Sequence, residues 1–130
     1  MALNILIVDD SAVTRAVILK TLVMSGIPIG QTRQAANGRE GLDVLEKEWI
    51  DLVFVDINMP VMNGEEMIEH VRANPLWKDI PLVVVSTEGS ETRIDRLQAN
   101  GAKFVHKPFT PELIRDVVEE IVRYKANEAQ

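Results

Sequence analysis

The sequence predicts an α/β fold, in which one five-stranded parallel sheet carries helices on both faces in a doubly wound (βα)5 arrangement. Short apolar runs alternate with longer amphipathic segments along the 130 residues. The clearest short runs are continuously apolar, which is typical of strands that are covered on both sides. Parallel strands joined by helices need right-handed crossovers, and these place helices on both faces of an open sheet.

Five short segments are predicted to be the strands. Leu3–Val8, Leu52–Val55 and Leu82–Val85 are the clearest, because each contains four consecutive apolar residues. A shorter candidate lies at Phe104–His106, and a weaker one, Thr32–Ala36, lies between the first two clear strands. Turn residues and amphipathic stretches separate all five.

Each strand is followed by a predicted helix. Ser11 opens the first helix, and the residues expected to face the core are Val13, Val17 and Val23. The next two helices begin with the spacing of a capping box, with Asn in place of Ser or Thr, in the pairs Asn37/Glu40 and Asn63/Glu66.

The last two helices differ in polarity. The segment Glu91–Asn100 is mostly polar, and its main apolar contacts are expected from Ile94 and Leu97. The run Thr110-Pro111-Glu112 supplies a cap, a proline at the first helical position and an acid in the first turn. The apolar stripe that follows at helical spacing comprises Leu113, Ile114, Val117, Val118, Ile121 and Val122.

Composition limits the domain count and the class of protein. The length predicts one domain over residues 1–125, with a tail at 126–130 that frays. Cysteine is absent, which excludes disulfides and thiolate metal sites. The net charge of −6 disfavours direct nucleic-acid binding. The short apolar N-terminal run excludes a signal peptide and membrane insertion, so a cytoplasmic protein is expected.

Polar side chains gather where the predicted strands end. Ligands bind at the carboxyl ends of the strands in such a sheet. The residues that leave the strands there are three acids, two hydroxyls and one lysine, namely Asp9, Asp10, Asp56, Ser86, Thr87 and Lys107. The lysine precedes a proline, which makes an ordinary surface position less favoured and predicts a rigid junction open to a cis peptide bond.

Three acids at one sheet edge require a counter-charge. Two carboxylates about 5 Å apart repel by roughly 3 kcal/mol at an effective dielectric near 20. Lys107 supplies one positive charge, whereas a divalent ion supplies two. All-oxygen ligands favour Mg²⁺, and Mn²⁺ also accepts such a set. A zinc site is not expected, because cysteine is absent and neither His70 nor His106 is spaced to pair with another ligand.

Four motifs together resemble one family. They are "ILIVDDS", "LVFVDINMPVMNG", "PLVVVSTEG" and "FVHKPFTPEL". With them the chain closely resembles, from Leu3 to Tyr124, the receiver domain of bacterial two-component response regulators, in its CheY-like, stand-alone form. The resemblance implies a flavodoxin-like fold and a signalling role that includes phosphorelay or chemotaxis. It also implies no enzymatic activity beyond the domain's own phosphorylation and dephosphorylation.

The resemblance assigns the acids residue by residue. Asp56 matches the phosphoacceptor, a carboxylate nucleophile that takes a phosphoryl group from the phosphohistidine of a sensor histidine kinase. Asp10 matches the direct Mg²⁺ ligand, and Asp9 matches its neighbour, which acts mainly through water. The backbone carbonyl of Asn58 matches the third protein ligand.

The resemblance also assigns the remaining polar residues. Lys107 matches the lysine that pairs with phosphoryl oxygens. Ser86, beside Thr87, matches the hydroxyl that moves toward the phosphoryl group. Phe104 matches the switch aromatic, which is often tyrosine in the family, so an output that needs the tyrosine hydroxyl is not expected here.

Two side chains are expected to set the lifetime of the phosphoryl group. Asn58 and Glu88 lie two residues beyond Asp56 and Ser86, where family members crowd or orient the attacking water. Small polar and acidic residues at these positions are similar to those of fast-signalling chemotaxis receivers. The alternative is that both are ordinary solvated loop residues.

Output is expected through protein binding, because the chain ends just after its last helix. The resemblance implies a surface formed by the fourth helix, fifth strand and fifth helix. Its partner would be a flagellar motor switch, a kinase or a phosphotransfer protein. A receiver cut from a longer regulator is the main alternative.

Two other classes of protein fit the sequence less well. A small Mg²⁺-dependent aspartyl-phosphate phosphatase usually carries a second Asp two residues after its nucleophile, and Asn58 stands there. In a flavodoxin the first loop must hold a phosphate, which Asp9 and Asp10 would repel.

Overall fold

The computed structural model describes the backbone of residues 2–128 and the side chains up to residue 123. Strands and helices alternate strictly along the chain. Their order and bounds are β1 (Leu3–Val8), α1 (Ala12–Met24), β2 (Ile29–Ala35), α2 (Gly38–Lys47), β3 (Leu52–Val55), α3 (Gly64–Ala73), β4 (Leu82–Ser86), α4 (Glu91–Ala99), β5 (Lys103–His106) and α5 (Pro111–Glu128).

The five strands form one parallel sheet in the order β2-β1-β3-β4-β5, which is the flavodoxin-like order. The chain first extends the sheet from β1 to β2 and then continues on the other side of β1. The order therefore reverses between β1 and β3, where Val8 pairs with Val55. A crevice that opens at the carboxyl ends of these two strands is where such sheets bind ligands.

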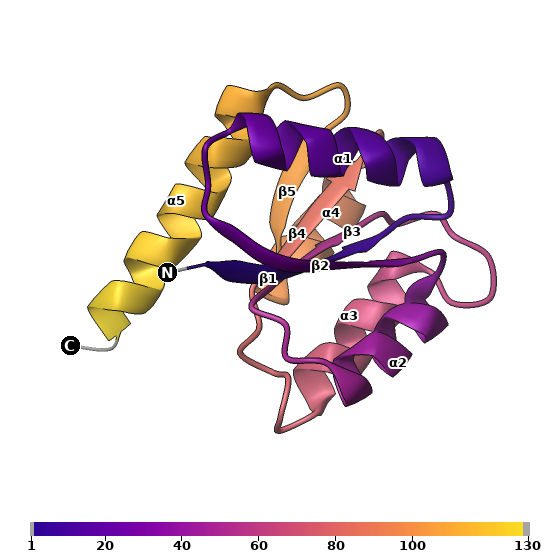
Figure 1. Ribbon diagram of the computed structural model, residues 1–130. Helices are drawn as coiled ribbons and strands as arrows, with labels where there is room; N and C mark the ends of the chain where they lie inside the picture. The colour runs from indigo at the N-terminus through magenta and orange to yellow at the C-terminus, as the bar shows by residue number, and fades with distance from the viewer. Residues whose placement is uncertain (1, 129–130) are drawn as a thin grey trace.

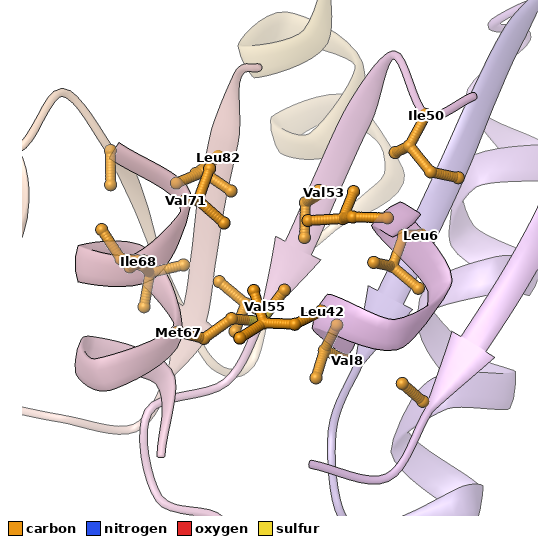
Figure 2. Close-up of a cluster of buried hydrophobic side chains, with 14 of the residues drawn as sticks. Leu6, Val8, Leu42, Ile50, Val53, Val55, Met67, Ile68, Val71 and Leu82 are labelled. Atoms are coloured by element: carbon orange, nitrogen blue, oxygen red, sulfur yellow. The ribbon is translucent and has the colours of Figure 1, made fainter. Parts of the chain in front are cut away.

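The sheet separates two apolar cores. Helices α1 and α5 cover one face, and α2 and α3 lie on the opposite face (Figure 1). The second core also includes Leu97 of α4. Figure 2 shows side chains of this second core, with Val55 of β3 beside Met67 of α3.

Alternation along each strand supplies both cores. In β1, Ile5 and Ile7 face α1 and α5, while Leu6 and Val8 face the other helices. All four are buried, which explains why the strand is continuously apolar. The prediction of a sheet covered on both faces is confirmed.

The predicted strand bounds agree at the centre of the sheet. The bounds of β1 and β3 are confirmed, and β4 and β5 are each one residue longer than predicted. The prediction for β2 was wrong at its start, because the strand begins at Ile29 instead of Thr32, and it was one residue too long at its end, which is Ala35. This edge strand exposes Gly30 and Gln31, so no apolar run marks its beginning.

The predicted core face of α1 was wrong. Val13, Val17 and Val23 are exposed, with 74% exposure at Val13. The buried apolar side chains of this helix are instead Ile18 and Leu22. Apolar residues occur on both sides of α1, so spacing alone did not identify the face that packs on the sheet.

The two predicted capping boxes have different outcomes. Asn63 and Glu66 form the complete reciprocal pair at the start of α3. Asn37 caps α2 by accepting a hydrogen bond from the Glu40 backbone N–H. The Glu40 carboxylate, however, accepts from the Ala36 N–H instead of the Asn37 N–H, so the second box is incomplete.

The last two helices differ in how firmly they pack. Leu97 is the buried side chain of α4, and Ile94 is half-buried. Thr110 caps α5 through the Leu113 N–H, as predicted. Within the predicted stripe, Leu113 and Val122 are substantially exposed, while Ile114, Val117, Val118 and Ile121 supply the contacts with the sheet.

Helix α5 continues to Glu128, inside the segment predicted to fray. Residues 129 and 130 lie outside the described part of the chain, so fraying of 126–130 stays a prediction. None of the described helices combines the length and apolar character needed to span a membrane.

The α1 packing is testable by paired truncation. Ile18→Ala is expected to lower the free energy of unfolding by roughly 2–4 kcal/mol, because it removes fully buried methyl groups and leaves a cavity. Val13→Ala, on the exposed face, is expected to change that free energy by less than about 0.5 kcal/mol. Urea denaturation measures both, and a larger loss at Val13 would contradict the observed helix orientation.

Candidate functional site

Three carboxylates meet at the carboxyl edge of the sheet. Asp9 follows β1, Asp56 follows β3, and these strands are neighbours. Ligand oxygens of Asp9, Asp10 and Asp56 all lie within 4.8 Å of one another. Asp9 is buried, Asp56 is half-buried and Asp10 is exposed. The predicted acidic cluster therefore exists, with its open side at Asp10.

Lys107 balances the two less exposed acids. Its Nζ lies 3.2 Å from Asp9 Oδ2 and 3.6 Å from Asp56 Oδ2. The other Asp9 oxygen accepts a hydrogen bond from the Ser11 N–H at 2.9 Å. Each Asp9 oxygen thus has a donor from the protein, which offsets the cost of burying a carboxylate that is 1% exposed. The Lys107–Pro108 peptide bond is cis.

The carboxyl group of Asp56 is balanced between opposing influences. Burial raises its pKa and is the largest cause, while the Lys107 charge lowers it. The Ile57 N–H, which donates to Asp56 Oδ1 at 2.8 Å, also lowers it, whereas Asp9 raises it. The net result is a raised pKa. Additional positive charge at this site would stabilise the carboxylate form, which is the nucleophilic one.

The donor set fits a hard divalent cation. The cluster offers carboxylate oxygens without histidine or cysteine, which is the chemistry that Mg²⁺ prefers. The exposed Asp10 leaves room for the waters that Mg²⁺ keeps in its shell. Asn58 follows Asp56 at the same edge and is exposed.

Ser86 lies at the end of β4, in the same edge of the sheet. Its side chain is buried, and its Oγ accepts a hydrogen bond from the Glu88 N–H at 3.2 Å. Its backbone carbonyl accepts from the Lys107 N–H at 3.0 Å. The backbone bond holds the end of β4 beside the segment that carries the lysine, just after β5.

Comparison with known proteins identifies the family. Residues 5–119 match the family described as "Response regulator receiver domain". The chain belongs to this family. The predicted family and flavodoxin-like fold are therefore confirmed.

The relatives include chemotaxis proteins. The "Chemotaxis protein CheY homolog" of Campylobacter jejuni is 35% identical over 122 residues, covering 92% of each chain. "Chemotaxis protein CheY1" of Helicobacter pylori strain J99 is 33% identical and is covered to 97% of its length by 92% of this chain. The solved structure of CheY4 from Vibrio cholerae has a TM-score of 0.81 at 33% identity, covering 93% of this chain and 99% of that one.

These similarities place the receiver domain among chemotaxis-type, CheY-like signalling proteins. They give no support to the alternative of an aspartyl-phosphate phosphatase, which belongs to a different class of protein. They likewise give no support to the alternative of a flavodoxin. This domain shares its fold with flavodoxins, but its first loop carries Asp9 and Asp10, which would repel a phosphate.

Two predicted site residues lie apart from the acids. Thr87 is exposed, and within the described residues its side chain makes no hydrogen bond to the cluster. Phe104 of the receiver domain is half-buried against the core on the α4 side. Its ring meets His106 edge-on, with centroids 4.7 Å apart. The switch role assigned to Phe104 stays a prediction.

Two arginines near the site were not predicted. Arg15 of α1 donates to the Asp9 backbone carbonyl at 2.6 Å and so holds the end of β1. Arg93 of α4 contacts Asn58, Glu65 and Glu88. A cation in the first turn of a helix is unfavourable. The position of Arg93 in the sequence therefore indicates that nearby acceptors hold it, although it does not identify them.

Gly64 allows α3 to begin close to the phosphoacceptor candidate. Its N–H donates to the Ile57 carbonyl at 2.8 Å. A Cβ at this position would lie 2.1 Å from the Asp56 backbone oxygen, and that backbone cannot move without displacing the strand end. The glycine that ends the second motif, "LVFVDINMPVMNG", is thus a packing requirement of the receiver domain.

The Gly64 contact is testable with a matched glycine. Gly64→Ala is expected to destabilise the domain by roughly 1–3 kcal/mol through overpacking. Gly89→Ala is the control, because a Cβ there meets nothing within 4 Å. That control is expected to stay neutral or to gain up to about 1 kcal/mol. Equal denaturation midpoints for the two variants would contradict the steric argument.

Proposed function

We propose that this receiver domain accepts a phosphoryl group from a sensor histidine kinase at Asp56. The observation that carries the proposal is the meeting of Asp9, Asp10 and Asp56 with Lys107 at one edge of the sheet. A carboxylate that must attack an anionic phosphoryl group needs positive charge beside it. The CheY names of the relatives support a role in chemotaxis-type signalling.

The transfer step is a single displacement. An oxygen of the Asp56 carboxylate forms a bond to the phosphorus of the kinase phosphohistidine, and the phosphorus–nitrogen bond breaks. The imidazole leaves with the bonding electron pair and takes up a proton. Hydrolysis later returns the Asp56 carboxylate and releases inorganic phosphate.

The surrounding residues neutralise and position the reacting groups. Mg²⁺, when bound, supplies positive charge to the phosphoryl oxygens. Asp9, Asp10, Asp56 and the Asn58 backbone carbonyl would hold it. Lys107, 3.6 Å from Asp56 in this structure, would pair with the phosphoryl oxygens that Mg²⁺ leaves open.

Phosphorylation would then alter the surface for a partner protein. The acyl phosphate adds nearly two negative charges close to Ser86 and Lys107. Movement of the Ser86 hydroxyl toward it would break the bond from the Glu88 N–H. Phe104 lies on the same side of the sheet as α4, so the α4, β5 and α5 surface would change. The partner would be a flagellar motor switch or a phosphotransfer protein.

Mass spectrometry tests the phosphoacceptor directly. Incubation with acetyl phosphate and Mg²⁺ is expected to add one phosphoryl group to the wild-type protein, and Asp56→Asn is expected to abolish the addition. Asp43→Asn, an exposed acid on α2, serves as the control and should be phosphorylated normally. Phosphorylation that persists in Asp56→Asn would refute the assignment.

Thermal melts test the cation site independently of phosphorylation. Asp10→Asn is expected to raise the melting temperature of the metal-free protein by roughly 2–4 °C, because it removes one of three clustered negative charges. The same change should weaken or abolish the additional stabilisation that Mg²⁺ gives the wild type. An Mg²⁺-induced shift equal to that of wild type would contradict the role of Asp10.

A further inference from the structure

A charged network connects the first turns of α3 and α4 beside the phosphoacceptor site. Arg93 Nε donates to the Glu65 carboxylate, and Arg96 Nη2 lies 3.4 Å from the same group. Arg93 Nη1 also lies 3.8 Å from Glu88 Oε2 and 3.5 Å from Asn58 Oδ1. One guanidinium therefore contacts α3 and both loops that carry the predicted lifetime residues.

This network differs from an ordinary surface ion pair. The side chains of Arg93 and Glu65 are only 25% and 22% exposed, whereas Arg96 is 61% exposed. Burial is the largest single influence on the Glu65 pKa and raises it. The hydrogen bond and charge of Arg93, followed by those of Arg96, together outweigh burial, so the pKa is lowered overall. The α4 dipole disfavours a cation in its first turn, so the acceptors around Arg93 account for its position.

The network reaches the reacting groups through two short connections. Asn58 lies two residues after Asp56, and its side chain is directed to Arg93. Glu88 lies two residues after Ser86, and its N–H donates to the Ser86 hydroxyl at 3.2 Å. Without Arg93, the half-buried Glu88 carboxylate would lose the cation recorded beside it.

We propose that Arg93 is a positioning residue for phosphoryl transfer at Asp56. It neutralises the Glu88 carboxylate and holds the Asn58 side chain toward α4, which keeps the approach to Asp56 open for an anionic phosphoryl donor. An unpaired carboxylate at the rim of the site would repel such a donor and slow its reaction. This inference rests on the proposed function of Asp56.

The test is the rate of phosphorylation by phosphoramidate, a small anionic donor that needs no kinase. Arg93→Ala is expected to lower the second-order rate constant about fivefold. Arg96→Ala is the matched control, because it removes the same charge from the same helix and also loses Glu65, but no contact of Arg96 with Glu88 or Asn58 is recorded. The control rate should remain within about twofold of wild type.

A second variant separates charge from general disruption. Glu88→Gln in the Arg93→Ala background should restore the rate to within about twofold of wild type, because it removes the unpaired charge. The Asn58 side-chain amide signal in the NMR spectrum of the unphosphorylated, metal-free protein should shift in Arg93→Ala and stay in place in Arg96→Ala.

The outcomes distinguish the two proposals. Equal rates for Arg93→Ala and Arg96→Ala, or failure of Glu88→Gln to restore the rate, would overturn the role of Arg93 while Asp56 remains the phosphoacceptor. If wild-type protein gains no phosphoryl group at Asp56, the proposed function fails, and the inference about Arg93 fails with it.

Discussion

Lys107 connects the ends of three strands, and the arrangement of the site depends on this connection. Its ammonium group lies between Asp9 at the end of β1 and Asp56 at the end of β3. Its backbone N–H donates to the Ser86 carbonyl at the end of β4. The ammonium group reduces the repulsion between the two neighbouring carboxylates and the cost of burying them. A single residue thus stabilises the acidic cluster and links it to the end of β4.

The sequence predicts most of the fold because both faces of the sheet are buried. In β1 and β3 this burial requires continuous apolar residues, so their bounds were readable. At the edge, β2 pairs with β1 alone and exposes Gly30, which removes that pattern. In α1 the exposed Val13 and the buried Ile18 are both apolar, so composition could not identify the packed side.

The site was predictable to the extent that topology determines it. Asp9, Asp56 and Lys107 follow strands directly, and parallel strands bring their carboxyl ends together. Arg93 and Glu65 come from different helices, 28 residues apart, and their pairing depends on how α3 and α4 pack. No local pattern encodes such packing. Residues supplied by helices around the sheet edge therefore need the three-dimensional structure.

The sparse packing of α4 leads us to expect that this helix opens more readily than α3. This helix buries Leu97, whereas α3 buries Gly64, Met67, Ile68 and Val71. Regions with few buried apolar contacts unfold locally at a lower free energy than the global transition. The amide hydrogens of α4 should therefore exchange with solvent earlier than those of α3. A small difference in contact energy is then enough to shift α4 between alternative conformations. The contacts of Arg93, in the first turn of this helix, are one source of such a difference.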